Sequence, residues 1–168
     1  MVISIIYLVL SLILDGFMSN IFSSTLNEIS LFTTIYCVIS FVIIYPYFDN
    51  NKKYYILLGI FGILFDILYT GTFIFNMVIF LIIGIIIKVL YNIFPENIFN
   101  TNVIGIICVS FYHIISYVIL ELVSGVSYDF MLLIYIIIHS ILMTIIYSSI
   151  SYFMMKFIYN KYNIKYIK

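Results

Sequence analysis

The stretch FIFNMVIFLIIGIIIKVLYNIF, residues 73–94, contains a single charged side chain, Lys88. A helix that crosses the roughly 30 Å hydrocarbon core of a bilayer needs about 20 mainly apolar residues. This stretch is long enough and apolar enough to be one such crossing. Similar apolar segments lie on both sides of it. The fold therefore depends on how many of these segments cross the membrane.

Composition extends this prediction to the whole chain. Of the 168 residues, 65% are hydrophobic and 8% are charged, with a mean hydropathy of +1.26. A soluble domain is roughly a quarter charged, so these residues are too apolar to build a water-facing surface. We therefore predict an all-α polytopic membrane protein with one integral membrane domain, residues 1–168, and no separate soluble domain.

The apolar stretches predict six transmembrane helices, at about residues 2–22, 29–48, 54–70, 73–94, 103–123 and 131–158. Polar and turn-forming residues separate them. The third stretch is the shortest, and at 1.5 Å per residue it barely covers the hydrocarbon core. The connection at Gly71 is very tight, so the third and fourth crossings should form a close antiparallel hairpin.

Charge predicts the orientation. With six crossings, all the basic residues fall at one end of the bundle: Lys52, Lys53, Lys88, Lys156, Lys161, Lys165 and Lys168. The other end carries Glu28, Glu121 and Asp129 and no positive charge. Cytoplasmic loops hold the excess of lysine and arginine, so both termini should be cytoplasmic. A composition without Ala, Arg or Trp is typical of an AT-rich bacterial genome, which places the protein in the bacterial cell membrane, with no nucleic-acid partner.

Small and weakly polar side chains recur at helical spacing on four of the predicted helices. The four stripes are Ser4, Ser11, Asp15 and Ser19; Gly59, Gly62, Asp66 and Tyr69; Asn76, Gly84 and Lys88; and Ser140, Thr144, Tyr147 and Ser151. In lipid such stripes mark the faces where helices pack closely. A packed bundle without chemistry explains all of them.

Five ionisable residues lie inside the predicted crossings: Asp15, Asp66, His113, Glu121 and His139. A charge near the bilayer centre costs a few kcal/mol or more, so such residues tend to face the interior and to mark function. Three alternatives remain open: His139 pairs with Asp66 or Asp15 across helices, the group forms a ligand or partner site, or it relays protons. The absence of acids in the inner half of the predicted bundle disfavours the relay.

Signatures of catalysis are scarce. The chain has no HExxH or CxxC motif and no glycine-rich phosphate loop. Two histidines on different helices are too few to argue for a metal site. Cys37 and Cys108 lie inside apolar runs and should act as small apolar side chains. We predict no catalytic residue, no metal, no cofactor and no enzymatic activity.

One segment resembles a known family. Gly59-Ile-Phe-Gly62-Ile-Leu-Phe-Asp66-Ile-Leu-Tyr-Thr-Gly71, followed by Asn76, looks like the third-helix signature of MreD, the bacterial rod shape-determining membrane protein. That family pattern has two glycines three apart, an Asp four residues later, a short turn and another apolar helix. The layout of six crossings agrees with it along the whole chain. Many members carry a proline near the start of the last helix, where this chain has His139 and Ser140.

The resemblance implies a non-enzymatic scaffold of the rod or elongation complex, which regulates cell shape and peptidoglycan synthesis. The implied partners are an MreC-like bitopic protein, an MreB-like filament, and RodA with its penicillin-binding transpeptidase. The implied packing or partner residues are Gly59, Gly62, Asp66, Gly71 and Asn76. The two glycines would admit a neighbouring helix, and Asp66 would make a polar interior contact.

The alternative function comes from a similar architecture. MreD looks like the substrate-binding subunits of energy-coupling-factor transporters, which capture vitamins in an outward-opening pocket. Asp15, Asp66, Glu121 and His139 would suit such a pocket in the outer half of the bundle. Those subunits usually carry spaced alanines on the first helix for docking, and this chain contains no Ala.

Overall fold

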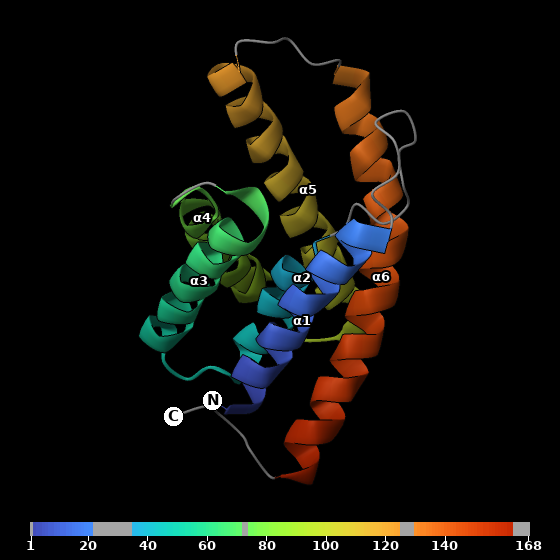
Figure 1. The fold of residues 1–168 in the computed structure, drawn as a ribbon. Coiled ribbons are helices and arrows are strands. Elements are labelled where there is room, and N and C mark those ends of the chain that lie inside the picture. Colours follow the sequence, from blue (N-terminus) through green and yellow to red (C-terminus); the bar gives the residue numbers. More distant parts are fainter. Residues whose placement is uncertain (1, 22–34, 72–73, 125–129, 163–168) are drawn as a thin grey trace.

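The computed structural model describes residues 2–21, 35–71, 74–124 and 130–162, and these residues form helices without any β-strand element (Figure 1). In chain order the elements are α1 (Val2–Ile21), α2 (Tyr36–Ile44), the 3-10 turn η1 (Tyr45–Tyr47), α3 (Asn51–Phe65), the π-helical turn η2 (Asp66–Thr70), α4 (Phe75–Ile93), α5 (Ile98–Ser124) and α6 (Phe130–Lys161). The all-α prediction is confirmed for the described residues.

Four helical segments are long and apolar enough to cross a membrane: Asn51–Thr70, Phe75–Ile93, Ile98–Ile119 and Phe130–Lys161. These segments support the prediction of a helical membrane protein. The third predicted crossing, 54–70, is longer in the structure because α3 begins at Asn51, and η2 continues it to the predicted end at Thr70. The close hairpin predicted around Gly71 is confirmed, since α3 packs along α4.

The second predicted crossing, 29–48, differs most from the structure. Ile35 has an extended backbone, and the helix that follows ends at Ile44 before the 3-10 turn that contains Pro46. The 9 residues of α2 span about 14 Å, which is half of a hydrocarbon core. Residues 22–34, which include Glu28 and the start of this predicted crossing, lie outside the described residues.

Helix α2 occupies the centre of the bundle. All of its residues are buried, and it contacts α1, α4, α5 and α6 (Figure 1). Its side chains join a single hydrophobic core with residues from every other helix. The long helices therefore form a wall around a short apolar helix that is covered by protein on all sides.

Helix α1 begins and α6 ends at the same end of the bundle. The hydroxyls of Ser4 and Tyr159 are 2.8 Å apart, and the Tyr159 ring stacks on Tyr47 with 4.0 Å between ring centroids. This end also carries Lys52 and Lys53 in the first turn of α3, so we call it the lysine end. Grouping of the lysines at one end is confirmed for the described residues; Lys165 and Lys168 lie outside them.

At the opposite end α5 and α6 extend past the other helices. The Tyr112 hydroxyl donates to the Asn76 side chain in the first turn of α4, which sets the level at which α4 begins. From Tyr112 α5 continues to Ser124, a further rise of about 18 Å at 1.5 Å per residue. Figure 1 shows α5 and α6 projecting beyond the turn between α3 and α4. We call residues 113–124 and 130–138 the α5–α6 arm.

Candidate functional site

Asp66 is a fully buried carboxylate with a dense set of donors. The backbone N–H of Asn76 lies 3.0 Å from both of its side-chain oxygens. The Asn76 amide Nδ2 donates to Oδ1 at 2.8 Å, and the Thr70 hydroxyl donates to the same oxygen at 3.1 Å. Asp66 is therefore bound mainly by the first turn of the next helix. This is a polar contact in the interior of the bundle.

The turn between α3 and α4 brings these groups together. Gly71 has φ of 62°, in the left-handed region, and its N–H donates to the Asp66 carbonyl at 2.9 Å to close η2. Ile74 is also left-handed, with φ of 73°, and it directly precedes α4. The first N–H groups of a helix have no partner within it, and a carboxylate is favoured there by the helix dipole. Asp66 thus caps α4 from outside that helix.

The two glycines of the family-like motif have different environments. A Cβ built on Gly62 would lie 2.4 Å from the Met77 Cα, so only hydrogen fits between the backbones of α3 and α4. A Cβ on Gly59 would lie 3.8 Å from the flexible end of the Met77 side chain, an ordinary contact. Of the predicted pair, Gly62 is the residue that the close approach of α4 requires.

Tyr112 extends the network to a third helix. Its hydroxyl donates to the Asn76 Oδ1 at 2.7 Å, which fills the acceptor that Asn76 does not use toward Asp66. We call Asp66, Thr70, Asn76 and Tyr112 the Asp66 cluster. Sequence reasoning missed Tyr112, because the chain holds 17 tyrosines and no pattern sets this one apart.

Asp15 makes a second contact of the same kind. Its two side-chain oxygens accept from the backbone N–H groups of Tyr36 at 2.8 Å and Cys37 at 2.9 Å. These are the first two residues of α2. No side chain of α2's own N-terminus caps it, so Asp15 on α1 supplies the acceptors, and the position of Asp15 sets where the central helix begins.

Tyr69 connects the two capped regions. Its hydroxyl donates to the Leu12 carbonyl on α1 at 2.6 Å, and its ring lies against Gly16, where a Cβ would come within 2.7 Å. The turn η2 is thereby attached to α1 close to Asp15. Gly16 was not singled out in the sequence, because the need for it arises from a tyrosine 53 positions away.

The remaining intramembrane ionisable residues, His113, Glu121 and His139, make other contacts. The His139 ring nitrogen Nδ1 lies 2.8 Å from the Tyr135 carbonyl of its own helix. This contact differs from the predicted alternative, in which His139 pairs with Asp15 or Asp66. His113 is half-buried and meets the Tyr112 ring edge-on, while Glu121 lies half-buried in the α5–α6 arm.

The other predicted stripes lie at helix contacts. On α6, Ser140, Thr144 and Ser151 are buried, and the Tyr147 hydroxyl is 3.1 Å from that of Ser40 in α2. Between α5 and α6, Asn102 exchanges hydrogen bonds with Ser148 and Ser149. Ser4, Ser11 and Gly84 are also buried, whereas the side chain of Ser19 lies outside the described residues. These contacts agree with interhelical packing.

In chemical terms the region holds helices together. Each carboxylate oxygen of Asp15 and Asp66 accepts hydrogen bonds from the protein itself. Among residues 2–21, 35–71, 74–124 and 130–162, no group of three or more His, Cys, Asp or Glu is placed to hold a metal ion. Comparison of the chain with family models, with curated proteins and with solved structures finds no match in any of the three.

Proposed function

We propose that this chain is a non-enzymatic scaffold of the bacterial cell membrane that binds a partner through the α5–α6 arm. The arm is the observation that carries the proposal. It projects past the α3–α4 turn and presents large apolar side chains that nothing in the described chain covers. They are Ile114, Val118, Leu122, Phe130, Met131, Leu132, Ile134, Tyr135 and Ile138.

Length makes the arm unusual for a helix pair in lipid. The 32 residues of α6 span about 48 Å, against a hydrocarbon core of about 30 Å. If α3 and α4 match the membrane, the apolar arm extends beyond its hydrocarbon core. Large contiguous apolar surfaces outside lipid mark sites of protein interaction. Leu122 is 78% exposed and Phe130 is 63% exposed, which suits contacts with a partner.

The Asp66 cluster supports a scaffold over a transporter. In the transporter alternative, Asp15, Asp66, Glu121 and His139 would line one outward pocket. Asp15 and Asp66 instead accept from the N-termini of α2 and α4, and His139 bonds within α6. Their hydrogen bonds serve the packing of helices, which a scaffold requires.

The partner we propose is an MreC-like bitopic protein of the elongation machinery, with an MreB-like filament, RodA and its penicillin-binding transpeptidase in the same complex. The residues that carry the MreD resemblance support this, because Gly62, Asp66, Gly71 and Asn76 meet in one contact between α3 and α4. By the positive-inside rule the lysine end is cytoplasmic. The arm then lies on the outer side, where it would meet the partner.

Site-specific photo-crosslinking in the host cell tests this function. A benzoylphenylalanine residue replaces Leu122 or Met131 on the arm, and the control replaces Ile85, an equally apolar residue of α4 that is 55% exposed. We expect crosslinks to the MreC-like protein from the arm positions and none from the control. Depletion of the chain should also widen or round the cells. Normal cell shape together with arm crosslinks to lipid alone would refute the scaffold function.

A further inference from the structure

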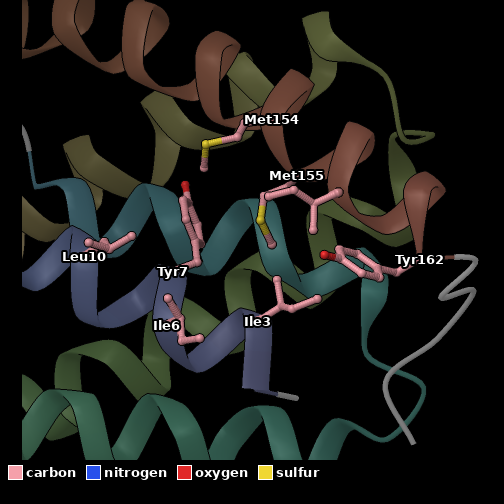
Figure 2. Close-up of a pocket in the computed structure, with 8 residues that line it drawn as sticks. Ile3, Ile6, Tyr7, Leu10, Met154, Met155 and Tyr162 are labelled. Carbon is pink, nitrogen blue, oxygen red and sulfur yellow. The ribbon is translucent and has the colours of Figure 1, made fainter.

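An apolar groove runs between α1 and α6 at the lysine end. Its volume is about 550 Å³, within the range of about 300–1,000 Å³ typical of small-molecule sites. Figure 2 shows side chains of α1 on one wall and of α6 on the other. The walls include Ile3, Ile6 and Leu10 from α1 and Met154, Ile158 and Tyr162 from α6.

The groove is open at the outer surface of the helix bundle. Helices α1 and α6 both pack on α2, and the groove lies between them. Ile6 is 55% exposed, Leu10 is 51% exposed and Met154 is 41% exposed, so the groove opens outward along its length. In a membrane protein this face meets acyl chains, which makes a lipid the natural occupant of an apolar groove.

Helical spacing puts Lys161 on the side of α6 that lines the groove. Lys161 follows Met154 and Ile158 at spacings of seven and three residues, so it shares their face of α6. It is exposed and lies in the last turn of the helix. The neighbouring Tyr162 is 63% exposed and also lines the groove. Lysine and tyrosine together at a membrane interface are the residues that meet an anionic headgroup.

Tyr7 places a buried hydroxyl beside the groove. Tyr7 is 5% exposed and reaches from α1 toward α6 (Figure 2). Its hydroxyl lies near those of Ser40, Tyr147 and Ser151 but makes no hydrogen bond of good geometry within the described residues. Leaving a hydroxyl unpaired in an apolar environment is costly. An acyl chain alone would not satisfy it, whereas the ester carbonyl of a phospholipid would.

We propose that this groove binds one anionic phospholipid. An acyl chain lies between Ile6 and Met154, an ester carbonyl accepts from the Tyr7 hydroxyl, and the phosphate pairs with Lys161. The Ser4–Tyr159 bond sets the register of the two helices. It places Lys161 and the Tyr7 backbone about 8 Å apart along the bundle, at 1.5 Å per residue. The proposal does not depend on the scaffold function.

Native mass spectrometry of the purified full chain in detergent tests the headgroup. The probes are palmitoyl-oleoyl phosphatidylglycerol and the matching phosphatidylcholine at equal concentration. We expect the wild type to retain one phosphatidylglycerol about five-fold better than phosphatidylcholine, the ~1 kcal/mol that a lysine near the membrane surface contributes. Lys161→Gln should abolish that preference. Lys52→Gln, an exposed lysine at the same end but on α3, should keep it.

A second pair of variants tests the acyl-chain site. Ile6→Trp fills the groove and should lower retention of both lipids, whereas Ile85→Trp, on α4 and also 55% exposed, should not. Equal retention of the two lipids by the wild type, or the same loss with Lys52→Gln as with Lys161→Gln, would overturn the proposal. If Ile6→Trp fails to fold, judged by its elution in size-exclusion chromatography, the lysine pair decides.

Discussion

Asp15 and Asp66 perform the same structural role in two successive helix pairs. Each lies near the end of its helix and accepts backbone hydrogen bonds from the first turn of the helix that follows, α2 for Asp15 and α4 for Asp66. Inside a bilayer no water is present to satisfy the first N–H groups of a helix. A neighbouring carboxylate replaces both the water and the local N-cap.

Replacing Asp66 with Leu should destabilise the protein strongly. The change leaves the Asn76 backbone N–H and side-chain amide without the Asp66 carboxylate, whereas the Thr70 hydroxyl keeps the Asp66 backbone carbonyl at 3.3 Å. Each buried group left unsatisfied costs about 1–3 kcal/mol, so the free energy of unfolding should fall by about 3–5 kcal/mol. Unfolding by SDS in mixed micelles measures it. Asp49→Asn, an exposed acid at the lysine end, is the control, and equal stability of the two variants would contradict the capping role.

The two motif glycines should respond differently to alanine. Gly62→Ala forces a methyl group against the Met77 backbone, and overpacking of this kind costs about 1–3 kcal/mol. Gly59→Ala has room, and alanine favours a helix over glycine by up to about 1 kcal/mol, so this variant should be neutral or slightly stabilised. Thermal unfolding in detergent separates them. A larger loss for Gly59→Ala than for Gly62→Ala would disprove the assigned contact.

Tyr159 should show separable contributions from its hydroxyl and its ring. Tyr159→Phe removes the hydrogen bond to Ser4 but keeps the stacking on Tyr47, and it should cost about 1 kcal/mol. Tyr159→Leu also removes the ring pair, worth about 0.5–1.5 kcal/mol more. The same SDS titration measures both variants. Ser4→Ala should match Tyr159→Phe, and additive losses in the Ser4→Ala/Tyr159→Phe double variant would argue against a direct bond.

Glu96 should give a pH-dependent stability. It lies between α4 and α5 at the lysine end, where partial burial raises its pKa and the Lys156 ammonium partly lowers it. With a folded pKa above the unfolded one, the folded chain holds more protons between the two values, so stability falls as pH rises through that window. Glu96→Gln should therefore raise the Tm at neutral pH, and the gain should vanish at pH values below the ordinary pKa of a glutamate.

A gain that stays constant across that pH range would rule out Glu96 as its source. Lys156→Gln removes the opposing charge and should shift the window upward in pH. Asp49→Asn again serves as the control, because Asp49 is another acid at the same end of the bundle.

The sequence predicted those features that depend on residue type and spacing. Apolar length predicted the helices at 73–94 and 131–158 within a few residues, and the small residues around Gly62 and Gly71 predicted the close α3–α4 hairpin. The polar stripe of α6 was predicted for the same reason, since every member recurs at helical spacing. These signals are local, so a single sequence contains them.

Other features could not be predicted from the sequence, for physical reasons. Asp15 and Asp66 bind backbone N–H groups, which every residue except proline carries, so no side-chain identity in α2 or α4 marks the contact. The prediction that His139 pairs with Asp15 or Asp66 assumed that an acid binds a basic side chain. The shortness of α2 was missed because a helix enclosed by protein and one enclosed by lipid are both apolar all round.

The enclosed position of α2 imposes an order on synthesis. The ribosome delivers residues 36–44 after α1 but long before α4, α5 and α6, the other helices that contact them, since α6 does not begin until Phe130. Until then this segment is too short to remain across the bilayer by itself. It has to be sheltered by the insertion machinery or lie at the interface. Nascent chains arrested before the last helix should therefore be recognised by membrane quality-control proteases, even though most of the chain has been made.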